Sequence, residues 1–168
     1  MQPDTNFQSI FCQSSDFFPI IQNPPAFALL IDLLVQHVQA HHPQVDAVFG
    51  LESRGFLIGP SLAQRLNVGF LPIRKAGKLP GPVHRHTYTL EYGSDTLEVQ
   101  SGRLERKSKC LIVDDLLATG GTLRAANHLL KQNGLEVLES LIVIELIGLN
   151  ARGPLENDGV QVFSLLEF

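Results

Sequence analysis

Residues 110–122 (CLIVDDLLATGGT) constrain the fold of this chain more than any other segment. Four apolar residues typical of a buried strand lead to two adjacent aspartates, where we expect the strand to stop. A loop of small residues follows, and 123–131 has helical spacing. Such a junction points free backbone N–H groups and the positive end of a helix dipole at one place, which suits a phosphate. Carboxylates beside it suit sugar hydroxyls, a metal-bound substrate or a developing cation. The segment therefore indicates a phosphorylated sugar as ligand.

The rest of the chain alternates between helical and strand patterns. We expect helices over 25–41, 55–66 and 121–132, and strands over 45–51, 69–73, 96–99, 110–113, 137–146 and 161–164. Gly134 is placed to end the third helix. This alternation predicts an α/β fold with a mainly parallel central sheet and helices on both faces, in a single domain spanning 1–168.

Three segments follow predicted strands, namely 50–55, 74–93 and 114–122. Ligands of parallel sheets bind beyond the carboxyl ends of the strands, so we expect all three at one rim. The longest segment, 74–93, is rich in Pro, Gly, Lys and His. Loops of that length in a compact domain are usually functional lids or disordered, and we interpret this one as a flexible lid loop.

The loop after the aspartates can wrap a phosphate. Gly120 and Gly121 allow close backbone approach, and Thr119 and Thr122 add hydroxyl donors. A nucleotide-hydrolysing Walker loop would need a lysine followed by Ser or Thr after its last glycine. Neither this loop nor 50–55, which has the Walker glycine spacing, is followed by that lysine. ATP or GTP hydrolysis is therefore disfavoured.

Asp114 and Asp115 place like charges side by side. Such a pair persists more easily when a ligand satisfies it, as ribose hydroxyls would by donating hydrogen bonds. The same carboxylates would stabilise positive charge that develops on a sugar ring.

Basic residues lie in the other two rim segments. Arg54 follows a predicted strand, and Arg74, Lys75 and Lys78 place three of the thirteen basic residues within five positions. Together they offer enough positive charge for an anion of pyrophosphate size. At the far end of the lid, Glu91 could handle a base proton, worth roughly 10²–10⁴ in rate.

Composition narrows the possible partners. A formal net charge of −4 argues against a general nucleic-acid binder, although a local basic cluster can still hold an anion. No secretory signal is visible, and the longest apolar run, 27–35, is too short to span a bilayer. We expect reduced thiols at Cys12 and Cys110. The histidine pairs His37/His41 and His84/His86 lack cysteine or acidic partners, so we expect no metal site at either.

These motifs resemble those of the adenine phosphoribosyltransferases, which have the type I phosphoribosyltransferase fold. The resemblance is carried by 50–56, 74–82, 90–93 and 113–122, and it extends from Pro19 to 163–166. The motif at 113–122 indicates the superfamily. The lysine-rich lid and the Leu-Glu-Tyr-Gly sequence at 90–93 single out the adenine branch.

The resemblance implies purine salvage, in which phosphoribose passes from phosphoribosyl pyrophosphate to adenine and gives AMP and pyrophosphate. It implies a cytoplasmic homodimer, and Mg²⁺ that arrives on the pyrophosphate substrate rather than on protein ligands. The implied site residues are Ala118, Thr119, Gly120, Gly121 and Thr122 for the 5′-phosphate; Asp114 and Asp115 for the ribose; Ser53, Arg54, Arg74, Lys75 and Lys78 for pyrophosphate; Leu116 for the base; and Glu91 and Tyr92 from the lid. Ser53-Arg54 would act through a strained peptide that can be cis.

One segment departs from the family. Its members usually carry an N-terminal hood over adenine that includes Arg-Asp-Ile, and this chain has Ser15-Asp16-Phe17 there. Segment 1–18 is therefore an atypical, reduced hood. Two alternatives stay open: a phosphoribosyltransferase with altered base preference, and a non-catalytic nucleotide-sensing protein of the same fold.

Overall fold

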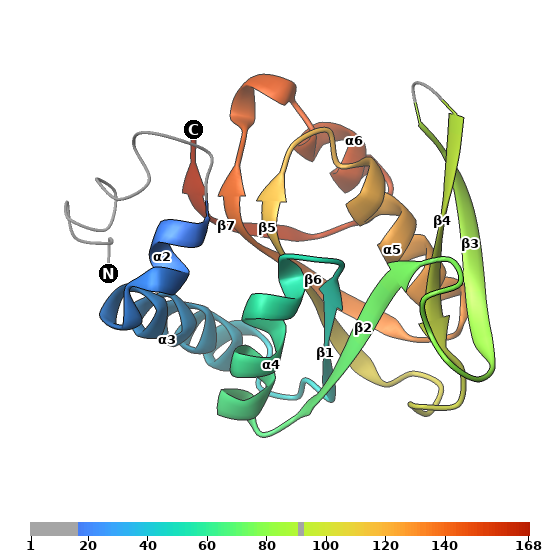
Figure 1. Ribbon diagram of the computed structural model, residues 1–168, viewed down its shortest axis with the longest axis horizontal. Helices are drawn as coiled ribbons and strands as arrows, with labels where there is room; N and C mark the ends of the chain where they lie inside the picture. The colour runs from blue at the N-terminus through green and yellow to red at the C-terminus, as the bar shows by residue number, and fades with distance from the viewer. Residues whose placement is uncertain (1–16, 91–92) are drawn as a thin grey trace.

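The computed structural model describes residues 17–90 and 93–168, and these form a seven-stranded sheet between layers of helices (Figure 1). The strand order is β3-β4-β2-β1-β5-β6-β7. The parallel strands are β1 (Ala47–Leu51), β2 (Gly69–Lys75), β5 (Lys109–Leu117), β6 (Glu136–Glu145) and β7 (Val162–Glu167). At one edge β3 (Val83–Leu90) and β4 (Gly93–Gln100) add an antiparallel hairpin. The predicted α/β fold is confirmed.

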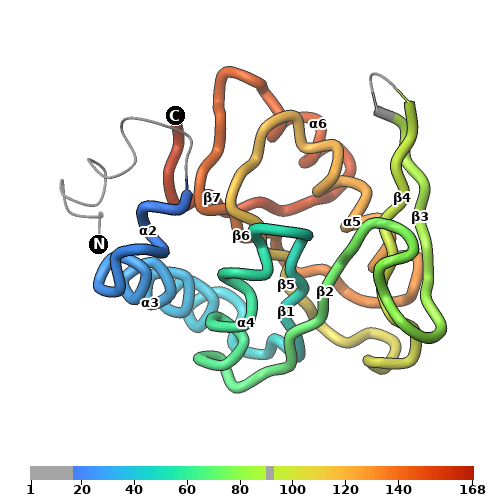
Figure 2. Tube along the Cα trace, in the orientation of Figure 1, coloured from blue at the N-terminus to red at the C-terminus, as the bar shows by residue number. Residues whose placement is uncertain are grey.

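The helices cover both faces of this sheet, as the Cα trace shows (Figure 2). On one face lie α2 (Phe18–Gln22), α3 (Pro24–His41) and α4 (Gly55–Leu66); on the other lie α5 (Gly121–Gln132) and α6 (Arg152–Asn157), with the short helix η1 (Ile147–Leu149) leading into α6. No helix in the described part of the chain is long and apolar enough to cross a membrane.

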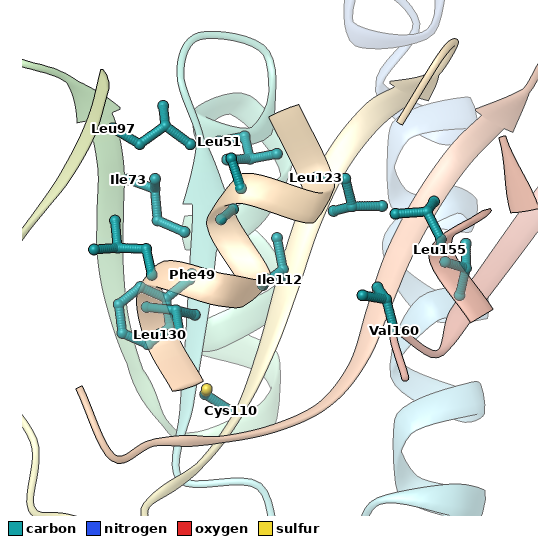
Figure 3. Close-up of a cluster of buried hydrophobic side chains, with 14 of the residues drawn as sticks. Phe49, Leu51, Ile73, Leu97, Cys110, Ile112, Leu123, Leu130, Leu155 and Val160 are labelled. Carbon is teal, nitrogen blue, oxygen red and sulfur yellow. The ribbon is translucent and has the colours of Figure 1, made fainter. Parts of the chain in front are cut away.

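Alternating strand residues feed two separate cores, because successive side chains of a strand point to opposite faces. On β1, Val48 packs with α2, α3 and α4, whereas Phe49 joins the core beneath α5. Figure 3 shows this second core, in which Phe49 and Ile112 of the sheet lie near Leu123 and Leu130 of the helix. Both faces of the central strands are therefore buried, which explains their nearly continuous apolar sequences.

The predicted helices 55–66 and 121–132 are confirmed at those bounds. Gly134, with a φ of 78°, follows α5 as predicted. The prediction missed α2, η1 and α6, which are too short to show helical periodicity. It was also wrong to end the strand before the aspartates. Asp114 pairs with Ile142 and Leu117 pairs with Glu145, so β5 continues because its backbone still has a partner in β6.

The prediction of a loop over all of 74–93 was wrong. β2 runs to Lys75, and Val83 to Leu90 pair in register with β4, from Val83 opposite Gln100 to Leu90 opposite Gly93. β-branched and aromatic residues such as Thr87 and Tyr88 favour an extended strand. The irregular part of the described segment is confined to 76–82.

Candidate active site

The carboxyl ends of β1 and β5 meet at one rim, as predicted, around a cavity of about 180 Å³. Its lining comes from the residue after β1, from β5 and the loop after it, from the first turn of α5, and from β6: Glu52, Asp114, Leu116, Leu117, Ala118, Thr119, Gly120, Gly121, Thr122, Leu123 and Ile142. The predicted phosphate loop, one of the two predicted aspartates and the predicted base contact Leu116 therefore share one cavity.

The phosphate loop ends at an open helix terminus. The residue that precedes α5, Gly120, makes no side-chain cap hydrogen bond to the start of the helix. Gly120 has a φ of 80°, and a Cβ there would lie 3.1 Å from Leu155, so this position favours glycine on two grounds. The Tyr88 hydroxyl of β3 lies 3.5 Å from the Thr122 Oγ1. Free N–H groups, a helix dipole and hydroxyls thus converge where an anion can bind.

The two aspartates are held differently. Asp115 is 2% exposed, and its Oδ2 lies 2.9 Å from the Arg54 Nε. Asp114 is partly buried, and its Oδ1 accepts a hydrogen bond from the Asp115 backbone N–H at 3.0 Å. Loss of water, then the neighbouring charge of Asp115, raises the pKa of Asp114 to about 8. Loss of water also raises the pKa of Asp115, and the Arg54 guanidinium opposes that shift.

Gly55 lets the start of α4 reach this pair. A Cβ on Gly55 would lie 2.5 Å from the Val113 carbonyl oxygen and 3.5 Å from Asp114 Oδ1. The absence of a side chain therefore lets Arg54, which precedes α4, stand beside Asp115. The cis peptide bond joins Glu52 to Ser53, one bond before the Ser53-Arg54 peptide named in the prediction.

Arg74 is held by Glu52 at the same rim. The Arg74 Nη2 and Nε donate to the two Glu52 carboxylate oxygens at 2.7 and 3.1 Å. The hydrogen bond from Arg74 is the main reason that the pKa of Glu52 lies below its usual range. The sequence analysis missed Glu52 because its partner lies 22 positions away. The one feature of the sequence that could have indicated Glu52 is its position directly after a predicted buried strand.

The two predicted lid lysines are placed differently. The Lys75 Nζ lies 3.0 Å from Asp95 Oδ2, and Lys75 does not line the cavity. Lys78 has an exposed side chain, while its backbone N–H donates to the Glu98 Oε1 at 2.8 Å. The structure therefore does not bring the Lys75 ammonium to the cavity.

Glu98 is a buried anchor that the sequence analysis also missed. Its Oε1 accepts from the Lys78 and Leu79 N–H groups, both at 2.8 Å, and its Oε2 accepts from Arg85 Nε at 3.1 Å. Loss of water favours the neutral acid, but these hydrogen bonds outweigh it and lower the pKa of Glu98 to about 2. Glu98 thus fixes the segment that carries Lys78 to the sheet.

Several predicted residues lie outside the described part of the chain. These are the lid residues Glu91 and Tyr92 and, in the hood, Ser15 and Asp16. The neighbouring Phe17 is described and is fully buried in the core beside α2 and α3.

Known proteins share this fold and much of this sequence. A family model described as a phosphoribosyl transferase domain matches residues 20–165. The adenine phosphoribosyltransferase of Homo sapiens is 47% identical over 154 residues, which cover 91% of this chain and 84% of the human one.

Solved structures agree with that match. The adenine phosphoribosyltransferase of Saccharomyces cerevisiae, solved with an imino-altritol bisphosphate and adenine, is 47% identical with a TM-score of 0.84, covering 90% of this chain and 85% of the yeast one. The enzyme of Giardia lamblia, solved with 9-deazaadenine, is 34% identical with a TM-score of 0.84, covering 91% and 85%.

An open helix terminus beside paired carboxylates, at the carboxyl edge of a mainly parallel sheet, defines an α/β protein that binds a phosphorylated sugar. The chain belongs to the adenine phosphoribosyltransferases, pentosyltransferases of the phosphoribosyltransferase family. These relatives do not favour an altered base preference or a nucleotide sensor without catalytic activity.

Proposed function

We propose that this protein transfers the phosphoribosyl group of phosphoribosyl pyrophosphate to adenine, giving AMP and pyrophosphate in purine salvage. The observation that carries this proposal is one cavity lined by both Asp114 and the open N-terminus of α5. A ribose 5-phosphate needs both features within one short span. Adenine is proposed as the acceptor base because the relatives are adenine phosphoribosyltransferases.

The 5′-phosphate binds at residues 118–122, where backbone N–H groups and the hydroxyls of Thr119 and Thr122 donate to its oxygens. The ribose hydroxyls donate to Asp114 and Asp115. These carboxylates also stabilise the positive charge that develops on the ring as the bond to pyrophosphate breaks. Ligand hydrogen bonds favour the ionised form of Asp114, and so offset the cost of its burial.

Pyrophosphate leaves on the basic side of the rim. Arg54 and Arg74 are already oriented there by Asp115 and Glu52, so little side-chain freedom is lost when the anion binds. Ser53 adds a hydroxyl, and Lys78 reaches the anion from its anchored segment. Lys75 can assist only after its ammonium group leaves the ion pair with Asp95 and binds the pyrophosphate instead.

The substrate pyrophosphate would carry the Mg²⁺ ion into the site. The carboxylates at the rim suit a magnesium–pyrophosphate complex, because Mg²⁺ prefers carboxylate and phosphate oxygens as ligands. Glu52 and Asp115 are each ion-paired to an arginine, Arg74 and Arg54 respectively. Within the described residues, Asp114 is therefore the rim carboxylate without an ion pair. The ion would neutralise charge on the leaving pyrophosphate while the protein orients both reactants.

Adenine packs near Leu116, which lines the cavity. Glu91 and Tyr92 close over the reacting centre, and Glu91 orients the base or takes its proton as the carbon–nitrogen bond forms. Exclusion of water protects a sugar cation that water would otherwise hydrolyse. We also propose a cytoplasmic homodimer, as in the family, and light scattering after gel filtration tests the dimer.

A panel of purine bases tests the function. The protein is incubated with Mg²⁺, phosphoribosyl pyrophosphate and adenine, hypoxanthine or guanine, and nucleotide formation is followed by chromatography. AMP formed from adenine alone supports the proposal. A different nucleotide would assign another base preference, and no product with any base, despite measurable ligand binding, would contradict enzymatic function.

A further inference from the structure

Histidines gather around one glutamate at the opposite end of the sheet from the active site. His37 and His42 lie at the end of α3, and Glu139 lies near the start of β6. The His37 Nε2 lies 2.6 Å from Glu139 Oε2, and the His42 Nε2 lies 3.1 Å from the same oxygen. Glu139 pairs with Leu111, three residues before Asp114 on β5, so this cluster is separate from the rim.

The cluster is ordered by its neighbours. The His37 ring stacks on Phe163 of β7 at 3.6 Å between centroids, and on His41 at 4.4 Å. The His41 Nδ1 lies 2.9 Å from the His37 carbonyl oxygen, and the His42 backbone N–H bonds to Val38. The His37 ring is therefore held by its neighbours, and the backbone position of His42 is fixed at the end of α3.

We propose that His37, His42 and Glu139 form a site for a divalent transition-metal ion, with Zn²⁺ as the ion that fits best. Each residue offers one ligand atom, and these atoms lie within 4.8 Å of one another. Two imidazoles and one carboxylate are a recurrent zinc ligand set, whereas Mg²⁺ and Ca²⁺ prefer oxygen ligands alone. The inference does not rest on the proposed catalytic function.

The dimensions allow the ion to enter with little movement. Tetrahedral ligands 2.0–2.1 Å from zinc lie about 3.3 Å from one another. The two histidine–carboxylate separations of 2.6 and 3.1 Å must open by less than about 1 Å. The two histidine nitrogens lie within 4.8 Å of each other, so they need to approach by at most about 1.5 Å. The side chains of His37, His42 and Glu139 are 13%, 20% and 15% exposed, so solvent has partial access to the cluster and a water can serve as the fourth ligand. Each Nε2 proton moves to Nδ1 or to solvent as the ion replaces it.

No metal site was predicted at His37 and His41, because the sequence shows no acidic partner close to them. The structure supplies Glu139 from 102 positions away, and His42 rather than His41 completes the set. A bound ion would join α3 to β6, so its expected effect is on stability and not on turnover.

Zinc titration of chelator-treated protein tests this site, by calorimetry and by thermal unfolding. We expect one equivalent of Zn²⁺ to bind and to raise the unfolding temperature. Glu139→Gln and His42→Asn should each weaken binding by more than the roughly 10–100-fold seen for residues outside the first ligand sphere. His128→Asn is the matched control, because His128 stacks on His86 beside the hairpin, and it should bind like the parent.

A second measurement needs no variant. Zinc should shift the imidazole NMR signals of His37 and His42 and leave those of His128 unchanged. The proposal is overturned if the parent binds no zinc, if Glu139→Gln binds as tightly as the parent, or if the shifts appear elsewhere.

Discussion

At the scale of the residue, the carboxyl of Asp114 is held where water is scarce and a second carboxyl is adjacent. Its pKa in the folded protein rises from 3.8 to about 8, so the folded state binds a proton that the unfolded chain has released. The contribution of Asp114 to stability therefore falls as pH rises through that window. The ligand site is maintained at a cost to the free protein, as is common for active sites.

Asp114→Asn should stabilise the ligand-free protein, because the amide needs no charge in that environment. We expect a gain of about 1–2 kcal/mol in the free energy of unfolding at pH 8, and a much smaller gain near pH 4. Chemical denaturation at the two pH values measures it. A variant that is less stable than the parent at pH 8 would contradict the account of this pair.

Gly55→Ala should damage both packing and the site. The new Cβ would meet the Val113 carbonyl oxygen at 2.5 Å, so α4 must move away from β5. We expect a loss of about 1–3 kcal/mol and weaker substrate binding, because Arg54 moves with the helix. Gly153→Ala is the control, since nothing lies within 4 Å of a Cβ there. Equal stability of the two variants would refute the argument.

The candidate site residues that lie within one local motif were predictable from the sequence. The phosphate loop and Asp114 needed only their neighbours in the chain, and the structure places them in one cavity. Glu52 and Glu98 were missed because their partners come from other strands. The Lys75 prediction failed to anticipate Asp95, which lies 20 positions along the chain.

At the scale of the element, the segment 76–82 depends on a carboxylate that belongs to β4. Glu98→Gln should release it, because an amide oxygen accepts the Lys78 and Leu79 N–H groups less strongly and leaves Arg85 without its ion pair. We expect a loss of about 1–3 kcal/mol and a raised KM for phosphoribosyl pyrophosphate.

The pH dependence gives an independent check on Glu98. Its pKa is about 2 in the folded protein against 4.5, so its stabilising effect is complete above about pH 4.5 and declines as pH falls toward 2. The difference in stability between the parent and Glu98→Gln should shrink over that range. The exposed Glu105→Gln is the control, and a constant difference would count against the anchor.

Helices with a regular spacing of apolar residues were predictable, whereas strand segments that depend on pairing with another strand were not. The apolar spacing and flanking glycines of α4 and α5 define their bounds within the chain itself. The extension of β5 and the hairpin of β3 with β4 depend on partners elsewhere in the sheet. A polar edge strand also lacks the apolar signal that identifies a buried strand.

At the scale of the whole molecule, two cores on either face of one sheet hold the strand ends that make the site. The α/β architecture was predictable because alternating strands and helices leave few topologies open. The site needs ends of β1, β2 and β5 together, although the residues concerned span positions 52 to 122. The central claim is that this assembled rim transfers phosphoribose to adenine.

The most direct test is the rate of AMP formation by the double variant Asp114→Asn, Asp115→Asn. Its circular dichroism and unfolding transition establish that it is folded, and turnover is measured with saturating adenine and phosphoribosyl pyrophosphate. Loss of both carboxylates should lower kcat by at least about 100-fold, because the charge developing on the ribose is no longer stabilised. Turnover within a few-fold of the parent would contradict the account.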